Sequence, residues 1–127
     1  MFGWRGRIGL IVPSSNSTFE PEMNAMCPAG VEVYATRVAF TADEQGLRGM
    51  RQHVRRASRD LAAEGLSNII VFGCTVGSMI EGKGYDEKIC AEITAETGIP
   101  AIATTTAVIA ALQALGTSRV AVATRGA

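Results

Sequence analysis

Small polar side chains and a thiol directly follow two apolar runs of the sequence. The first run leads into Pro-Ser-Ser-Asn, and another leads into Gly-Cys-Thr-Val-Gly-Ser. Backbone N–H groups in the turn after Cys74 can hold a planar anion without a cation, helped by the hydroxyls of Thr75 and Ser78. The amide of Asn16 can donate to a carboxylate oxygen whether or not that oxygen is charged. These residue types suit a small carboxylate better than a phosphate ester.

The thiol of Cys74 has two interpretations. N–H donors at the turn that follows it would lower its pKa and favour the nucleophilic thiolate. A free cysteine is also often a small buried apolar residue, so packing at the end of a strand remains an alternative. Cys27, beside Pro28, and Cys90, beside Ile89, are interpreted as packing residues.

Other motifs in the sequence give weaker indications of function than the loops that contain Asn16 and Cys74. Residues 77–84 nearly match a phosphate-binding loop, but Gly84 stands where that loop needs a magnesium-binding hydroxyl. A Cys-x5-Arg phosphatase loop would need arginine at the position of Ile80. The only histidine, His53, lies in an arginine-rich amphipathic helix and is interpreted as a solvated residue rather than the base of a cysteine protease. Acidic residues on the same helix indicate a salt-bridged face for its arginines, at positions 48, 51, 55, 56 and 59.

Apolar runs and helical patterns alternate along the chain. Ser17 and Glu20 have the spacing of a capping box, which predicts a helix over residues 18–26. Strands are predicted at residues 8–12, 31–38, 69–72, 101–104 and 120–124. The other helices are predicted through residues 50–61 with an end at Gly65, from residue 86 to Gly98, and from residue 105 or 106 to Gly116.

This alternation predicts an α/β fold, a flavodoxin-like parallel sheet with helices on both faces. Ligands of such sheets bind beyond the carboxyl ends of the strands, where the strand order reverses. In the order 2-1-3-4, the loops that contain Asn16 and Cys74 flank that point. No helix follows the run at 120–124, so this strand is expected at an edge or against another chain.

Composition narrows the function classes. The chain has 127 residues, 47% of them hydrophobic, and 12 basic residues balance 12 acidic ones. One domain of this size folds without metal or disulfides, and zero formal charge argues against nucleic acid as a partner. No run is long enough for a membrane helix, so we expect a cytoplasmic protein with reduced thiols and no structural zinc.

Three segments together resemble the maleate cis-trans isomerase family of the aspartate/glutamate racemase superfamily, which is related to arylmalonate decarboxylase. They are RIGLIVPSSNSTFEPEM at 7–23, FGCTVGSMIEGKGYDE at 72–87 and ETGIPAIATTTAVIAALQALGTSRVAVAT at 96–124. The resemblance implies two pseudo-symmetric α/β halves with the active site between them, one cysteine from each half, and no cofactor or metal. This chain matches one half of that fold.

The resemblance also implies site roles. Cys74 corresponds to the cysteine of the first half, the nucleophile that adds to a double-bond carbon of a small dicarboxylate such as maleate. Asn16 corresponds to the carboxylate-binding amide. Decarboxylases of the superfamily lack a cysteine at this position, so its presence favours isomerase or racemase chemistry. The other residues expected to line the anion pocket are Ser14, Ser15, Thr75, Val76 and Ser78.

The chain differs from the family in length. Relatives are about twice as long, so residues 1–117 are interpreted as an N-terminal α/β domain and residues 118–127 as the first strand of a missing second domain. Arg125-Gly126 stands where relatives commonly have Pro-Tyr. We expect a truncated chain with a half-site, little or no isomerase activity, and a homodimer that covers its apolar surface. A racemase using Cys74 for proton transfer, and a non-catalytic module that binds a small anion or a protein, remain alternatives.

Overall fold

A four-stranded parallel sheet is the centre of the part of the chain that the computed structural model describes, residues 2–41 and 43–123. The side chains of residues 44, 47, 48 and 51 lie outside that description, and two of the arginines predicted on the salt-bridged face, at 48 and 51, are among them. The strand order is β2-β1-β3-β4, as predicted. The strands are β1 (Gly6–Pro13), β2 (Val31–Val38), β3 (Ile69–Phe72) and β4 (Ala101–Ala103).

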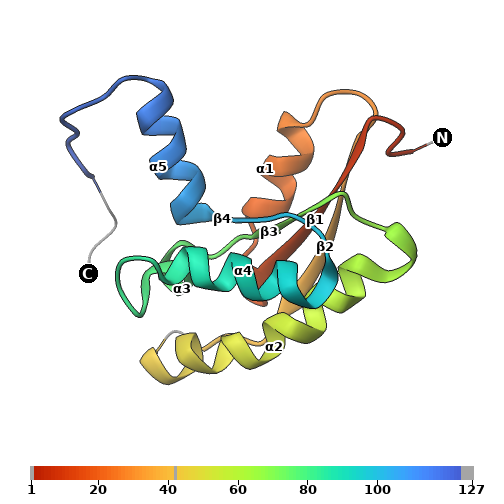
Figure 1. The fold of residues 1–127 in the computed structure, drawn as a ribbon, viewed down its shortest axis with the longest axis horizontal. Helices are drawn as coiled ribbons and strands as arrows, with labels where there is room; N and C mark the ends of the chain where they lie inside the picture. Colours follow the sequence, from red (N-terminus) through yellow and green to blue (C-terminus); the bar gives the residue numbers. More distant parts are fainter. Residues whose placement is uncertain (1, 42, 124–127) are drawn as a thin grey trace.

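Helices cover both faces of the sheet, so the predicted α/β class is confirmed (Figure 1). α1 and α5 lie on one face, and the long α2 and α4 lie on the other. α3 is a short helix that the strand and helix patterns do not predict as a separate element. The helices are α1 (Phe19–Met26), α2 (Glu44–Ala62), α3 (Thr75–Met79), α4 (Tyr85–Thr97) and α5 (Thr104–Ala114), and the 3-10 turn η1 (Ala63–Gly65) follows α2.

The core lies between the sheet and the α2–α4 layer. Ile11 and Phe72 from the central strands are almost completely buried, as are Ile89 and Ile93 from α4. The apolar stripe predicted for the long helix is buried as well, which explains why α2 packs with that side on the sheet. Its members are Met50, Val54, Ala57 and Leu61.

The start of α1 differs from the predicted capping box. Thr18 is the N-cap residue, and its side chain makes no capping hydrogen bond. The side-chain oxygen of Asn16 caps the helix instead, because its Oδ1 accepts from the backbone N–H of Thr18 at 3.1 Å and of Phe19 at 2.9 Å. Asparagine at a helix start commonly accepts such bonds. The residue expected to bind a carboxylate therefore also orders the helix after it.

The predicted strand at 120–124 is not formed over its described residues, 120–123, and Thr124 lies outside the description. Val120 is 54% exposed and Val122 is 82% exposed. A strand forms where its backbone groups meet a partner strand, and this segment pairs with none of the described strands. Among the described residues, no helix has the length and apolar character needed to cross a membrane.

α5 is attached to the rest of the domain through its first turn. No residue of α5, all of which is described, is buried. Three successive threonines bond to three different elements. Thr104 donates to the carbonyl oxygen of Phe72 in β3, and Thr105 shares a hydrogen bond with Ser78 of α3. Thr106 donates to the carboxylate of Asp86, a buried residue of α4.

Thr106→Val should destabilise the domain by about 1–3 kcal/mol, because it removes a hydroxyl donor from a buried carboxylate without changing side-chain volume. Urea denaturation measures this difference. The matched control is Thr117→Val, since the Thr117 hydroxyl donates to the carbonyl oxygen of Leu112 at an exposed site. Equal effects of the two substitutions would contradict the anchoring role of Thr106.

Candidate functional site

A pocket of about 620 Å³ lies at the carboxyl ends of the strands. The pairing of β1 with β2 and β3 brings their loops together, because Ser14 N donates to Val38 O and Gly73 N donates to Ile11 O, both at 2.8 Å. This is the place predicted from the strand order. The lining residues are Pro13, Asn16, Thr18, Phe19, Glu22, Phe40, Gly73, Cys74, Thr75, Val76 and Thr104.

Cys74 lies in the wall of this pocket at the junction of β3 and α3. It is the N-cap residue of α3, and its Sγ accepts a hydrogen bond from the backbone N–H of Gly77 at 3.3 Å. Gly77 allows this close approach, since a Cβ at that position would stand 2.8 Å from Sγ and 2.6 Å from Cε of Met50. The residue is 8% exposed. The thiol is therefore both held by the backbone and adjacent to the pocket.

Burial raises the pKa of the Cys74 thiol above its ordinary value, and the hydrogen bond from Gly77 opposes this rise only in part. The sequence predicted a lowered pKa, and that expectation is wrong for this chain. Transfer of a charged sulfur from water into an apolar wall favours the neutral thiol. One backbone donor does not compensate for that loss of solvation.

The alkylation of Cys74 by iodoacetamide should therefore have its pH midpoint above that of the same residue in the urea-unfolded chain. Peptide mass spectrometry after a timed quench measures the rate at this position alone. The same shift makes the folded state lose stability as pH rises from the unfolded-state pKa through the folded-state pKa. A folded-state midpoint at or below the unfolded value would contradict this prediction.

The contacts of Asn16 decide which of its side-chain groups can bind a ligand. Its Oδ1 is occupied by the N–H groups of Thr18 and Phe19, so the two Nδ2 hydrogens are what the side chain can offer to a ligand. The residue is half-buried and lines the pocket. The helix cap thus sets the orientation of the amide that the sequence predicted as a carboxylate ligand.

The pocket contains only some of the other predicted site residues. Thr75 and Val76 line it with exposed side chains at the start of α3. Ser78 is buried, and its hydroxyl donates to Thr75 O and bonds to the Thr105 hydroxyl, so it links α3 to α5 instead. Ser14 is exposed and lines a neighbouring cavity, while Ser15 is exposed and is not part of the wall.

Several wall residues were not predicted. Phe19 and Glu22 lie one turn apart on α1, and Glu22 is the charged residue among the described lining residues. Thr104 lies at the carboxyl end of β4, where strand position alone would have suggested it. Phe40 comes from the loop after β2, and nothing in its local pattern indicates a site. Its position depends on the arrangement of the whole sheet.

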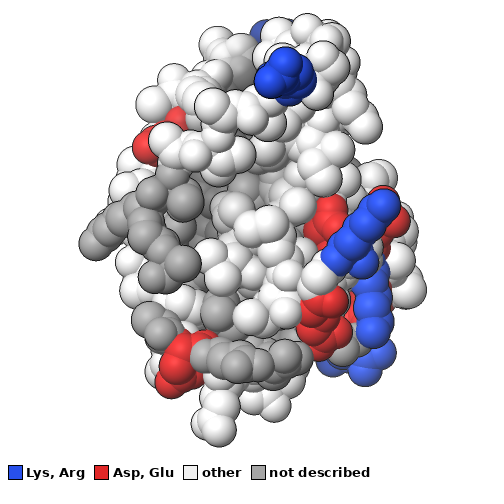
Figure 2. Space-filling view, turned by 90° about the vertical axis from the view of Figure 1, so that its left-hand side faces the viewer, with Lys and Arg blue, Asp and Glu red and all other residues white. Residues whose placement is uncertain are grey.

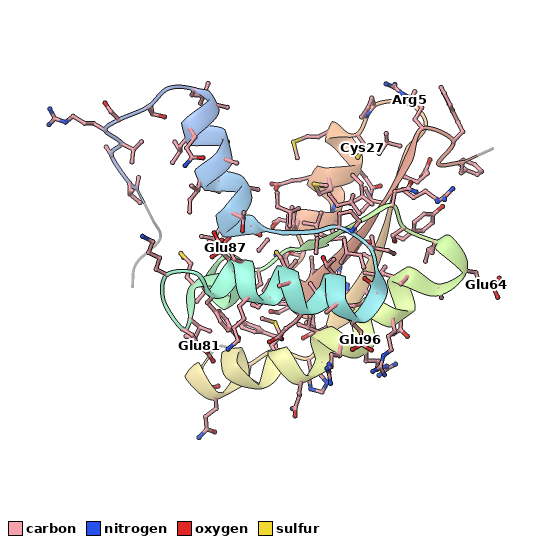
Figure 3. All side chains as sticks on the ribbon, in the orientation of Figure 1. Arg5, Cys27, Glu64, Glu81, Glu87 and Glu96 are labelled. Atoms are coloured by element: carbon pink, nitrogen blue, oxygen red, sulfur yellow. The ribbon has the colours of Figure 1, made fainter. Side chains whose placement is uncertain are left out.

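The remaining candidates lie away from the pocket. Cys27 is the C-cap residue of α1 and lies toward the amino end of β1, the opposite end of the sheet (Figure 3). His53 is exposed, as predicted. On the other face, Arg55 and Arg59 pair with Glu96, and the hydrogen bond from Arg59, together with the charges of Arg59 and Arg55, holds the pKa of Glu96 below its ordinary value. Among the described residues, no cluster of His, Cys, Asp and Glu could hold a metal ion.

Comparison with known proteins connects this site to a family. The profile of the arylmalonate decarboxylase family matches residues 8–126. A maleate isomerase from Nocardia farcinica is 33% identical over an alignment of 128 positions, which covers 93% of this chain and 51% of the relative. The chain thus spans about half the length of the curated relatives it matches.

Solved structures give the same result. A cysteine-to-alanine variant of the maleate isomerase from Pseudomonas putida S16, with maleate, has a TM-score of 0.80 at 26% identity, over 87% of this chain and 49% of that one. A cysteine-to-serine variant of the N. farcinica maleate cis-trans isomerase, with a covalently bound succinylcysteine intermediate, has a TM-score of 0.76 at 25% identity. That match covers 87% of this chain and 49% of the solved one. The fold is therefore one half of an aspartate/glutamate racemase-type fold, as predicted, and the chain belongs to the arylmalonate decarboxylase family.

Proposed function

We propose that this chain supplies the nucleophile half of a cofactor-independent cis–trans isomerase site for a small dicarboxylate of the maleate-to-fumarate type, in the cytoplasm. The observation that carries the proposal is the position of Cys74, whose thiol lies in the wall of a pocket shared with the amide of Asn16. The similarity to maleate isomerases supports the substrate class.

The proposed reaction needs no oxidant or reductant. The Cys74 thiol, which is neutral in the resting site, first gives its proton to solvent water. The resulting thiolate adds to one alkene carbon and forms a C–S bond, while the π electrons move onto the neighbouring carboxylate as an enediolate. The former double bond is now single and rotates. The electron pair then returns, the C–S bond breaks, and the trans diacid leaves the thiolate regenerated. The succinylcysteine intermediate described for the N. farcinica relative supports a sulfur-bound four-carbon unit.

Donors in the pocket can stabilise the charge that develops on the carboxylate. The first N–H groups of a helix have no carbonyl partner within the helix, and those of Thr75 and Val76 begin α3. Together with the Asn16 amide they can bind carboxylate oxygens. Preorganised donors of this kind stabilise an enediolate more than the ground state. We propose this binding role for Asn16, Thr75 and Val76.

A covalent trapping experiment tests the proposal. The purified chain is incubated with maleate, acid-quenched and digested, and the peptide that contains Cys74 is examined for a succinyl adduct. We expect the adduct at Cys74, and slower alkylation of Cys74 but not of Cys90 when maleate is present. Succinate, which has no double bond, should slow alkylation without forming an adduct. If maleate gives no adduct and does not protect Cys74 from alkylation, the proposal is wrong. A non-catalytic flavodoxin-like module is then the remaining alternative.

A second candidate is proton transfer next to a carboxylate, as in a racemase. The raised pKa of Cys74 favours it, because a thiol that is neutral near pH 7 can donate a proton. Deuterium wash-in from solvent at the α-carbon of a bound amino acid or dicarboxylate would support this reaction. Isomerisation through reversible thiolate addition does not require that exchange.

We also propose that the isolated chain has little or no isomerase activity and forms a dimer. In this proposal residues 1–117 are the first domain, and residues 118–127 begin a second one. Figure 2 shows the side of the molecule that carries α5, with charged side chains at its edges and an uncharged middle. The large apolar residues of α3 and α5 that are exposed are Val76, Met79, Val108 and Ile109. Light scattering at micromolar concentration should give the mass of a dimer, and a monomer would contradict it.

A further inference from the structure

Arg37 connects the carboxyl end of β2 to the loop that carries Asn16. Its Nη1 donates to the carbonyl oxygen of Asn16 at 2.6 Å and to that of Ser14 at 3.4 Å. Its Nη2 donates to the carboxylate of Glu20, in the first turn of α1, at 2.9 Å. One guanidinium thus joins β2, the loop after β1 and the start of α1.

These contacts restrain Asn16 from two directions. Its backbone carbonyl is bonded to Arg37, and its side-chain Oδ1 is bonded to the N–H groups of Thr18 and Phe19. Glu20 extends the restraint, because it ties the first turn of α1 to the same guanidinium. The position of the backbone and the orientation of the amide are therefore both set, with the Nδ2 donors left for the pocket.

Stability does not account for this arrangement. The side chain of Arg37 is 43% exposed and that of Glu20 is 35% exposed, and exposed ion pairs contribute little to the free energy of folding. The planar fork of arginine bonds to the Asn16 carbonyl and the Glu20 carboxylate at once. A lysine ammonium at the end of a flexible chain does not offer that fork.

We propose that Arg37 is a positioning residue for carboxylate recognition, which acts by holding Asn16 with its amide donors toward the pocket. The inference rests on the proposed function, since it assumes that the pocket takes a carboxylate. Arg37 itself is absent from the wall of the pocket, so its effect passes through Asn16.

The first measurement follows the position of Asn16 without any ligand. In Arg37→Gln, backbone amide exchange at Thr18 and Phe19 should accelerate by about tenfold, because the acceptor of their hydrogen bonds is no longer held. Arg37→Lys should give an intermediate effect. The matched control is Arg59→Gln, which removes an exposed arginine that pairs with Glu96 of α4 on the other face of the sheet, and it should leave both amides unchanged.

The second measurement follows recognition at the thiol. The rate of Cys74 alkylation by iodoacetate is divided by the rate with iodoacetamide, and the same ratio in the urea-unfolded chain is the reference. This normalised ratio reports how strongly the folded chain favours a reagent that carries a carboxylate over one that carries an amide. Arg37→Gln should lower this ratio about tenfold, since misplaced donors lose much of their effect. In the Asn16→Ala background, Arg37→Gln should lower it no further, because both substitutions remove the same interaction.

The outcomes separate the two proposals. A wild-type chain with no preference for iodoacetate would contradict the proposed function and the role of Arg37 with it. A selective wild type in which Arg37→Gln changes neither exchange nor selectivity would overturn only the role of Arg37. Additive losses in the double variant would also overturn it, since Arg37 would then act independently of Asn16.

Discussion

Cys74→Ser should abolish the maleate adduct and lower any fumarate formation by the chain on the order of 10³-fold or more, as removal of a catalytic nucleophile does in other enzymes. A serine hydroxyl without a base beside it remains protonated and does not add to the alkene. The fold should survive, because serine is a favoured N-cap residue and its oxygen can accept the Gly77 N–H bond that Sγ accepts now. Adduct mass, fumarate absorbance and the urea midpoint measure the three effects.

Cys90→Ser is the matched control. Cys90 is a partly buried cysteine of α4 that packs against the core, outside the pocket. Its substitution should change the urea midpoint more than the adduct yield at Cys74. Adduct formation that persists in Cys74→Ser, or that disappears in Cys90→Ser, would remove Cys74 from the proposed reaction.

The sheet and the location of the site could be predicted because both depend on local patterns. Continuous β-branched runs such as residues 69–72 mark strands buried on both faces, and their alternation with helical patterns leaves few topologies. Once the strand order is known, the loops after β1 and β3 must meet. The position of Cys74 and Asn16 at one pocket follows from that order alone.

The start of α1 shows where local spacing misleads. Ser17 and Glu20 match a capping box, but the carboxylate of Glu20 is bonded to Arg37 of β2. A partner distant in sequence thus takes the group that the motif requires. Asn16, one residue before Ser17, then supplies the capping oxygen. The local motif contains no information about that tertiary contact.

The pKa of Cys74 was predicted in the wrong direction for a similar reason. The N–H donors after the residue are visible in the sequence as a turn before a helix. The depth of the thiol is not, because it depends on packing between elements: Cys74 belongs to the same buried cluster as Met50 of α2 and Tyr85 of α4. Desolvation by neighbours from another element then outweighs the local hydrogen bond.

Gly73→Ala should destabilise the domain by about 1–3 kcal/mol and reshape the pocket, because the new methyl group overpacks a closely filled site. A Cβ at Gly73 would stand 2.3 Å from Cε1 and 2.4 Å from Cδ1 of Phe19, and 3.1 Å from Cγ1 of Val12. Val12 is completely buried and cannot yield, so the ring of Phe19 must move.

Because Phe19 begins α1 and its N–H bonds to Asn16, movement of the ring should also reduce the preference of Cys74 for iodoacetate. The matched control is Gly6→Ala, since a Cβ at Gly6 meets nothing within 4 Å. That substitution should be neutral or stabilise the fold by less than about 1 kcal/mol. If Gly73→Ala matched Gly6→Ala in urea midpoint and in alkylation ratio, the close contact of Phe19 with the β3 loop would not shape the pocket.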